Sequence, residues 1–336
     1  MGEVKKNVSL KQFNTFGIEV QTNSFVEINS KDELKEILKN NQSELLILGG
    51  GSNILFTKDF AGLIIKNNIK GIDVVDENDN EITLKVGSGE VWHDFVIYCV
   101  NRNYGGIENL SLIPGTVGAC PIQNIGAYGV EVKDVIKSVE AIDIKELTTI
   151  SFSNKICKFD YRSSIFKTSA KGKYVITSVI FNLSKNPKTN TSYGAIEEEL
   201  KKTGVLKPSI IDVSNAVINI RKSKLPNPNE IGNAGSFFKN PTVGFAKKNQ
   251  LLSEYPSMPN YLQKDGSFKL AAGWLIETCG LKGLQKGNCG IHKNQALVLV
   301  NYGGSSGNEI LKLSEEIIEK VKSKFGVELE REVNII

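Results

Sequence analysis

A strand, a run of glycines and a second strand near the N-terminus constrain the fold of this chain more than any other feature. The apolar runs Glu44 to Leu48 and Gly62 to Lys66 are strand-like, and Gly49-Gly50-Gly51-Ser52-Asn53 follows the first of them. Glycines let backbone N–H groups approach phosphate oxygens, while Ser52 and Asn53 add side-chain donors. The segment is neither a G-x-G-x-x-G turn nor a P-loop, so an ordinary glycine-rich turn stays open as the alternative to a phosphate site.

Helix and strand signals then divide the chain into regions. Ser30-Lys31-Asp32-Glu33 is a capping-box pattern and predicts a helix over residues 31–40. From about residue 70 the pattern changes to strands and turns, with an apolar strand over residues 174–183. A polar, proline-rich segment over residues 224–233 predicts a linker, followed by a strand at 295–302 and an amphipathic helix at 310–325 that Gly326 ends. At 336 residues the chain exceeds one ordinary core, so we expect two or three lobes with ligands at their junctions.

Composition excludes several classes of function. The net charge of +4 is spread along the chain, which argues against nucleic-acid binding. The sequence has neither a signal peptide nor an apolar stretch of membrane-spanning length, and the N-terminus does not fit myristoylation, so we expect a cytoplasmic protein without membrane insertion. Five cysteines without paired spacing and only two histidines predict reduced thiols and no metal site. We expect a monomer.

A second glycine-rich segment spans residues 113–129. Its glycines are Gly115, Gly118, Gly126 and Gly129, and they are interleaved with Gln123 and Asn124. Backbone without side chains can lie flat on a ligand, and its amides can bind the edge of an isoalloxazine ring. A tight chain crossing inside the core explains the same pattern, so both interpretations stay open.

Three side chains are candidates for chemistry. Arg162 lies among apolar and aromatic residues, where a buried guanidinium needs an anionic partner, either a ligand or an internal carboxylate. Ser236 has small residues on one side and aromatic residues on the other. A Ser-His-Asp hydrolase would need His93 or His292 brought in by the fold and lacks a G-x-S-x-G elbow, so it is the weaker interpretation. Glu332 lies near the C-terminus on an expected final strand, where a solvated charge is the ordinary role.

Six segments together resemble one family. They are Asn14-Thr15-Phe16-Gly17, Leu48 to Asn53, Ile113 to Gly129, Tyr161-Arg162, Gly232 to Pro241 and the closing Leu-Glu-x-Glu-Val. The sequence resembles the UDP-N-acetylenolpyruvoylglucosamine reductase (MurB) family, also called the UDP-N-acetylmuramate dehydrogenases. The resemblance runs from Phe13 to Val333, which is nearly the whole chain.

The resemblance implies the fold and the ligands. It implies an α+β chain with a vanillyl-alcohol-oxidase-type (PCMH-type) FAD-binding fold of two lobes plus a separate α+β substrate-binding domain. We therefore expect lobe 1 over residues 1–68, lobe 2 over residues 69–224 and 326–336, and the substrate-binding domain over residues 225–325. The implied ligands are non-covalent FAD, NADPH as the hydride donor and a nucleotide-sugar substrate.

Residue roles follow from motif positions in that family. For FAD the resemblance implies Gly49, Gly50, Gly51, Ser52, Asn53, Gly115, Thr116, Gly118, Gln123, Asn124, Gly126 and Ala127. For catalysis it implies Arg162, Ser236 and Glu332, and for the substrate Tyr128, Tyr193, Lys224, Lys239, Asn240 and Gln295. Tyr193 lies in a segment that resembles the subclass in which a tyrosine on an extra loop closes over the nucleotide.

The implied reaction reduces UDP-N-acetylglucosamine enolpyruvate to UDP-N-acetylmuramate, a step in peptidoglycan precursor biosynthesis. Hydride passes from flavin N5 to the vinyl carbon, Ser236 supplies the proton, and Arg162 and Glu332 stabilise the charge that develops on the carboxylate. A hydroxyl suffices as the acid because an enolate is a strong base. A flavin oxidase of the same fold, and a flavin- or nucleotide-binding protein without turnover, stay open as alternatives.

Two residues depart from the family pattern. Gly50 lies where relatives often carry Glu, and Cys120 lies where a small or hydroxyl residue is common. A cysteine beside a flavin would make the protein sensitive to oxidants, whereas a thiol packed in the core would be inert.

Overall fold

The structure, a computed structural model, describes residues 2–336. These residues form two compact units. Unit 1 contains the N-terminal residues through Val8 together with Thr22–Gly50 and Ala61–Ser223, and unit 2 contains Ser9–Gln21, Gly51–Phe60 and Lys224–Ile336. The chain therefore passes from unit 1 to unit 2 within the first glycine-rich segment. The lobe and domain boundaries expected at residues 68, 224 and 325 stay predictions.

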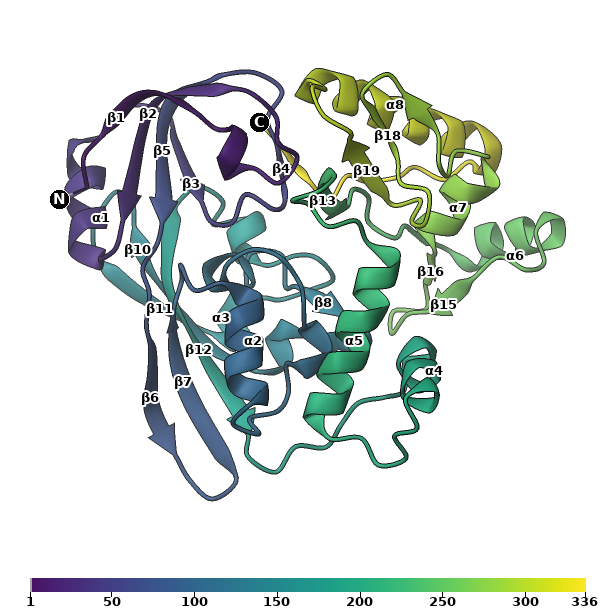
Figure 1. Cartoon of the computed structure of the whole chain (residues 1–336), viewed down its shortest axis with the longest axis horizontal. Coiled ribbons are helices and arrows are strands. Elements are labelled where there is room, and N and C mark those ends of the chain that lie inside the picture. The colour runs from purple at the N-terminus through teal and green to yellow at the C-terminus, as the bar shows by residue number, and fades with distance from the viewer. Residues whose placement is uncertain (1) are drawn as a thin grey trace. The chain divides into compact units, whose positions relative to one another are not determined.

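The first sheet of unit 1 has four strands in the order β1-β2-β5-β3 (Figure 1). They are β1 (Lys5–Ser9), β2 (Gln21–Ile28), β5 (Phe60–Asn67) and β3 (Leu45–Leu48). β3 and β5 run parallel, with Leu45 opposite Leu63 and Leu48 opposite Lys66. The two strands predicted around the glycine run are confirmed, and the run begins where β3 ends.

Helix α1 (Lys31–Asn40) packs on this sheet, with Leu34 in one buried cluster with the sheet's strands. Its predicted cap is confirmed in part, because the Ser30 side chain accepts a hydrogen bond from the Glu33 N–H at 3.2 Å. The return bond differs from a capping box, since the Glu33 carboxylate accepts from the Asn29 N–H at 2.7 Å. The cap therefore satisfies one N–H inside the helix and one before it.

The second sheet of unit 1 is antiparallel and has the order β11-β10-β12-β7-β6. Its strands are β11 (Thr149–Ser153), β10 (Ile136–Asp143), β12 (Tyr174–Ser184), β7 (Glu81–Gly87) and β6 (Ile72–Glu77). β12 confirms the strand predicted over residues 174–183. It is buried along almost its whole length, including its polar residues Thr177 and Ser178.

Unit 1 also contains helices that the strand-and-turn prediction for this region missed. They are α2 (Trp92–Val100), α3 (Asn154–Cys157), α4 (Gly194–Lys202) and α5 (Ile210–Lys224). α2 packs its aromatic residues on β12, with the Phe95 and Phe181 ring centroids 4.9 Å apart. α4 and α5 pack on each other in a separate small core that contains Ile196 and Val217. The buried residues of α2 recur at helical spacing, but the apolar Ile97 and Tyr98 lie outside that stripe and weaken the pattern in the sequence.

Shorter elements connect these sheets and helices. A two-residue hairpin is formed by β8 (Gly126–Ala127) and β9 (Val130–Glu131). Single turns of 3-10 helix lie at Lys11–Phe13, Glu108–Leu110, Val117–Ala119, Val132–Asp134 and Ile165–Lys167. Much of the second glycine-rich segment is therefore irregular backbone rather than strand.

Unit 2 is built on a second α+β arrangement. Its main sheet has the order β13-β19-β18-β17, and a smaller sheet has the order β14-β16-β15. The strands are β13 (Gly232–Ser236), β19 (Val298–Asn301), β18 (Cys289–Ile291), β17 (Gln285–Lys286), β14 (Thr242–Val243), β16 (Phe268–Leu270) and β15 (Asn260–Leu262). The helices are α6 (Phe245–Glu254), α7 (Ala272–Thr278) and α8 (Gly307–Phe325).

α8 confirms the long amphipathic helix predicted from the sequence. It buries the predicted apolar stripe, and Gly326 ends it in the left-handed conformation at φ +61°. Ser306 and Glu309 form a full capping box at its start. Beyond it, β20 (Asn334–Ile335) pairs in parallel with β4 (Ile54–Leu55), so the C-terminal end of the chain lies beside the segment that follows the first glycine run.

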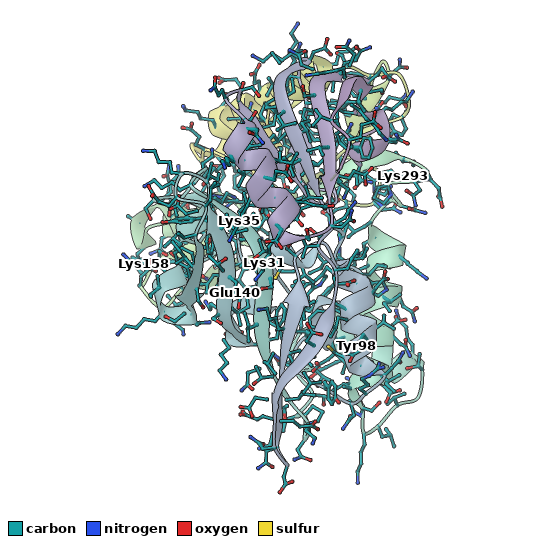
Figure 2. The ribbon with its side chains drawn as sticks, turned by 90° about the vertical axis from the view of Figure 1, so that its left-hand side faces the viewer. Lys31, Lys35, Tyr98, Glu140, Lys158 and Lys293 are labelled. Atoms are coloured by element: carbon teal, nitrogen blue, oxygen red, sulfur yellow. The ribbon has the colours of Figure 1, made fainter. Side chains whose placement is uncertain are left out.

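A carboxylate with two lysine partners joins α1 to the second sheet of unit 1. Glu140 of β10 binds Lys31 of α1 at 2.7 Å and Lys85 of β7 at 2.8 Å, and it accepts from Ser178 at 3.0 Å. Figure 2 shows Lys31 and Glu140 close together. Burial alone would raise the pKa of Glu140, but these hydrogen bonds outweigh it and lower the pKa to about 2.

Candidate active site

The two glycine-rich segments meet in unit 1, backbone against backbone. A Cβ atom added at Gly50 would lie 2.8 Å from Cα of Gly115, and one added at Gly49 would lie 2.5 Å from Oγ1 of Thr116. Gly115 also has φ +109°, which favours glycine. The tight chain crossing therefore exists, and Gly50 is exposed at it. An exposed backbone surface without side chains fits a cofactor that carries phosphates.

Lys66 supports the first glycine run from the neighbouring strand. Its Nζ donates to the carbonyl oxygen of Gly49 at 2.6 Å. Burial lowers the pKa of Lys66, and Glu27 opposes that shift. The sequence offered one signal for this residue, because Lys66 is a lysine at the end of an apolar strand. Sequence reasoning took it as the end of the strand and no more.

Gly118 has a packing role within the second segment. A Cβ atom added there would lie 2.6 Å from the Cβ of Ser88, and the Gly118 N–H donates to the Ser88 carbonyl at 2.8 Å. The neighbouring Thr116 forms an isolated bridge with Val91. These contacts fix the path of the chain immediately after Gly115.

Gln123 and Asn124 lie in the turn before the β8–β9 hairpin. The Asn124 side chain is fully buried. Its amide donates to Glu131 and to the Asp160 carbonyl, both at 3.1 Å, and its oxygen accepts from the Lys133 N–H at 3.1 Å. Asn124 therefore ties the glycine-rich segment to the turn that carries Arg162, and its role toward FAD stays a prediction.

Arg162 lies at the tip of that turn. Asp160 and Ser163 exchange backbone hydrogen bonds of 3.0 and 3.1 Å, and Arg162 between them has φ +51°. Its guanidinium donates to the Gly126 carbonyl at 2.8 Å and lies 5.4 Å from the centroid of the Tyr161 ring. A left-handed conformation is costly for a residue with a Cβ atom, and such strain is often found at functional sites. Gly126 and Ala127 form β8, so the predicted residues Arg162, Gly126 and Ala127 lie together.

Tyr128 and Tyr193 also lie together in unit 1. Their ring centroids are 5.3 Å apart with an interplanar angle of 86°. Tyr128 has φ +50°, and burial raises the pKa of its hydroxyl. Tyr193, immediately before α4, is 50% exposed. Buried Asn109 joins their loops, because its amide donates to the carbonyls of Tyr128 and Asn190 at 3.1 and 2.9 Å.

The rest of the first glycine run belongs to unit 2. Gly51 has φ +63°, and a Cβ atom there would lie 2.0 Å from the Phe13 carbonyl oxygen. The Thr15 N–H donates to the Gly51 carbonyl at 3.1 Å, so the run is joined to the Asn14-to-Gly17 motif. Ser52 is half-buried, and the Asn53 amide donates to the Glu332 carbonyl at 3.3 Å.

Ser236 and Glu332 lie on neighbouring stretches of backbone in unit 2. The Glu332 N–H donates to the Phe237 carbonyl at 2.8 Å, and Phe238 and Arg331 form an antiparallel bridge. Ser236 is exposed at the end of β13, while Phe237 is fully buried. Glu332 lies between the bridge and β20 rather than inside a strand, which corrects the expected final strand. The correction has a simple cause, since only two residues of this tail pair with β4.

Three of the four remaining predicted substrate residues of unit 2 already have partners within the unit. Lys239 pairs with Glu330, and the Asn240 side chain accepts from the Ala272 N–H at 3.0 Å at the start of α7. The Gln295 side-chain oxygen accepts from the Leu297 N–H at 3.4 Å. Lys224 is exposed at the end of α5. Their roles toward a nucleotide stay predictions.

Cys120 lies in the large core of unit 1 and is 1% exposed. Burial raises the pKa of its thiol well above the usual range, which keeps it protonated. This environment is that of a packed, unreactive thiol.

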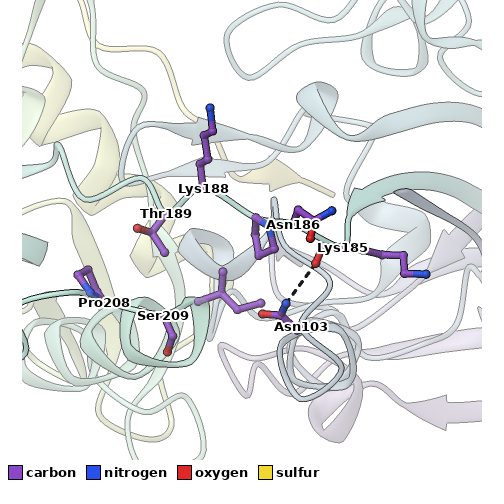
Figure 3. A pocket seen from close by; sticks show the side chains of 9 residues that line it. Asn103, Lys185, Asn186, Lys188, Thr189, Pro208 and Ser209 are labelled. Atoms are coloured by element: carbon purple, nitrogen blue, oxygen red, sulfur yellow. Dashed lines mark hydrogen bonds between the residues drawn. The ribbon is translucent and has the colours of Figure 1, made fainter. Parts of the chain in front are cut away.

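A polar hollow on unit 1 has none of the predicted site residues in its lining (Figure 3). Its lining includes Asn103, Lys185, Lys188 and Ser209, and Asn103 donates to the Lys185 carbonyl at 3.2 Å. Within residues 2–336 no cluster of three His, Cys, Asp or Glu side chains is arranged to hold a metal ion. Every helix in the same range is too short or too polar to cross a bilayer.

Comparison with known proteins gives matches to both parts of the chain. An FAD binding domain model matches residues 23–150, and the C-terminal domain model of UDP-N-acetylenolpyruvoylglucosamine reductase matches residues 227–336. A protein of Flavobacterium johnsoniae with the name UDP-N-acetylenolpyruvoylglucosamine reductase is 50% identical over 99% of this chain and 100% of its own length. The protein of that name from Amoebophilus asiaticus is 48% identical over 99% of each chain.

A crystal structure of UDP-N-acetylenolpyruvylglucosamine reductase from Thermus caldophilus has the same fold. It aligns with a TM-score of 0.71 and 22% identity, over 100% of this chain and 99% of its own. The fold and the FAD-binding domain define an FAD-dependent oxidoreductase of the vanillyl-alcohol-oxidase type, which confirms the predicted fold class and cofactor. Within that class, the chain belongs to the UDP-N-acetylenolpyruvoylglucosamine reductase family.

Proposed function

We propose that this chain reduces UDP-N-acetylglucosamine enolpyruvate to UDP-N-acetylmuramate, with NADPH as the reductant and FAD bound without a covalent link. Relatives that carry the reductase name align with 99% of the chain, which supports the proposal. The product is a precursor of peptidoglycan, so the enzyme acts in cell-wall synthesis. Its location in the cytoplasm and its monomeric state are part of the same proposal.

FAD, when bound, would supply the hydride transfer from NADPH to the vinyl carbon of the enolpyruvyl ether. The exposed crossing of Gly49 and Gly50 with Gly115 and Thr116 would hold the cofactor through backbone groups, with the Thr116 hydroxyl beside them. Lys66 adds a positive charge behind Gly49, although its hydrogen bond goes to the carbonyl.

The pairing of the backbone near Ser236 with the backbone at Glu332 is the observation that carries the mechanism. It puts a hydroxyl and a carboxyl group on two adjacent, well-anchored stretches of one unit. After the vinyl carbon receives hydride, negative charge develops at the neighbouring carbon and spreads into the carboxylate. Ser236 gives its proton to that carbon and is reprotonated from solvent, because its hydroxyl is exposed.

Arg162 binds the substrate carboxylate with its planar guanidinium. Its strained backbone and its bond to the Gly126 carbonyl fix the orientation of that group before substrate arrives. Glu332 donates a hydrogen bond to the same carboxylate when its own carboxyl group carries a proton. Both contacts strengthen as charge develops, so they favour the transition state over the bound substrate.

The nucleotide binds to residues 225–325 in this proposal, through Lys239, Asn240 and Gln295, with Lys224 at the boundary. The lysines serve as point charges for the diphosphate. Tyr193 closes over the nucleotide, starting from its half-exposed position beside Tyr128.

An anaerobic stopped-flow experiment on the flavin absorption band tests the proposal. Purified protein is mixed first with NADPH and then with the enolpyruvyl substrate, which separates the two half-reactions. Bleaching by NADPH followed by recovery on addition of substrate is the expected result. Bleaching that only oxygen reverses indicates an oxidase, and bound flavin that NADPH does not bleach indicates a binding protein without turnover.

A further inference from the structure

Helix α2 holds the chain at two points, one just before the second glycine-rich segment and one within it. The Trp92 indole N–H donates to the Leu110 carbonyl at 2.9 Å, and the Trp92 backbone N–H donates to the Gly115 carbonyl at 3.0 Å. Between these points lies Leu112, which has φ +59°. A leucine in the left-handed region is strained and persists only where its surroundings fix it.

Both peptide groups of Leu112 are bound by side chains. The Leu112 N–H donates to Nδ1 of His93 on α2 at 3.0 Å, and the Leu112 carbonyl accepts from Nε of Arg221 on α5 at 3.2 Å. α5 makes a second contact one residue earlier, where the hydroxyls of Ser111 and Ser214 lie 2.8 Å apart. Two helices therefore fix the strained peptide three residues before Gly115, at the chain crossing.

The electrostatic surroundings keep His93 in the form that can accept this bond. Burial lowers the pKa of His93, Arg221 and Lys222 lower it further, and Asp94 opposes them. A neutral imidazole with its proton on Nε2 has a free lone pair on Nδ1, whereas a protonated imidazole has none. Arg221 also forms a hydrogen bond with the Tyr128 side chain, so the same guanidinium joins Leu112 to a predicted substrate residue.

We propose that His93 and Arg221 are positioning residues that hold the peptide of Leu112, and through it Gly115 and Thr116, in the conformation that binds FAD. This inference rests on the proposed role of the chain crossing in cofactor binding. Protonation of His93 removes the acceptor and places a second positive charge near Arg221. FAD affinity therefore falls as the pH falls through the pKa of His93.

The experiment measures FAD affinity of the apoprotein by flavin fluorescence across a pH series. In the wild type, the dissociation constant rises as the pH falls below about 8, by up to about tenfold once His93 is protonated, because protonation removes one hydrogen bond. His93→Leu shows the weak binding at every pH, about tenfold above the wild-type constant at the alkaline end. His93→Asn, whose side-chain oxygen replaces Nδ1 but does not titrate, stays within about threefold of the wild type at the alkaline end and loses the pH dependence.

His292→Asn is the matched control, since His292 is the chain's other histidine and lies in unit 2. It retains the pH dependence of the wild type. Arg221→Met weakens FAD binding about tenfold, and Arg221→Lys recovers part of the loss. Thermal unfolding of each apoprotein separates loss of folding from loss of affinity, and His93→Asn decides the question if His93→Leu does not fold.

Unchanged FAD affinity and pH dependence in His93→Leu, or a pH dependence that persists in His93→Asn, would overturn the positioning role. A wild-type protein that folds but binds no FAD would instead overturn the proposed function, so the two failures are distinguishable.

Discussion

The predicted site residues of the two units are built into the fold in different ways. In unit 1 they are part of the packing, because Gly49, Gly50 and Gly115 form a crossing without room for a Cβ atom and Asn124 is fully buried. In unit 2, Ser236 is exposed at a strand end, with its support coming from the backbone pairing of the next residues. The same molecule thus has one set of residues that shapes a surface and another that presents single functional groups.

The difference teaches how each set responds to substitution. A glycine at a crossing acts through shape, so replacing it changes the fold and the affinity for the cofactor together. An exposed hydroxyl acts through its proton, so removing it changes a rate and leaves the fold intact. Substitutions at Gly50 and at Ser236 should therefore separate binding from chemistry.

Ser236→Ala is the sharpest test of the chemical side of this comparison. We expect reoxidation of the reduced flavin by substrate to slow by about 100- to 10,000-fold, because the proton donor is lost. Reduction by NADPH and the melting temperature should stay at wild-type values, since the hydroxyl is exposed. Stopped-flow absorbance measures the two half-reactions separately.

Ser253→Ala in α6 is the control, because Ser253 is also exposed and also lies in unit 2. It should leave both half-reactions unchanged. An equal slowing of both half-reactions in Ser236→Ala would refute the proton-donor role.

Gly50→Ala tests the structural side. The added methyl group would lie 2.8 Å from Cα of Gly115, so the two segments must move apart. We expect FAD affinity to fall about tenfold and the free energy of unfolding to fall by about 1–3 kcal/mol, the usual effect of overpacking. Fluorescence titration with FAD and denaturant unfolding measure the two quantities.

Gly244→Ala is the matched control, because a Cβ atom there meets no other atom within 4 Å and its φ is −72°. It should change neither quantity by a comparable amount. If Gly50→Ala kept the wild-type FAD affinity and free energy of unfolding, the two segments could move apart at little cost, and their close contact would not determine cofactor binding.

The sequence predicted those parts of the fold that local patterns determine. The strands at the first glycine run, α1 with its Ser30 cap, and α8 with its apolar stripe each follow from periodicity and capping within one segment. α2 was missed although its buried residues recur at helical spacing, because the apolar Ile97 and Tyr98 outside that stripe weaken the pattern. The resemblance to the family supplied the fold class and cofactor that no single motif determined.

The candidate site shows a similar limit. Glycine content indicated both segments, yet only the structure shows that Gly50 meets Gly115, since that contact joins positions far apart in the chain. The hydrogen bonds of His93 and Arg221 to the Leu112 backbone were not predicted, because nothing in the local sequence indicates that this peptide is strained. Contacts between a backbone group and a residue far away in the sequence are therefore the ones that sequence analysis is least able to predict.

Glu140→Gln tests the comparison within unit 1, because Glu140 stabilises the fold and is not one of the predicted site residues of either unit. Its hydrogen bonds to Lys31, Lys85 and Ser178 lower its pKa to about 2, from an ordinary value of 4.5. A lowered carboxyl pKa contributes stability that is fully present above pH 4.5 and is lost as the pH falls toward about 2.

We expect Glu140→Gln to lower the free energy of unfolding by about 1–2 kcal/mol at neutral pH, with some screening because the ion pairs of Glu140 are partly exposed. The difference between variant and wild type should shrink across that acid range, while exposed Glu146→Gln shows no such difference. If Glu140→Gln instead altered the rate of flavin reoxidation at unchanged stability, the separation between residues that build unit 1 and residues that react would not hold.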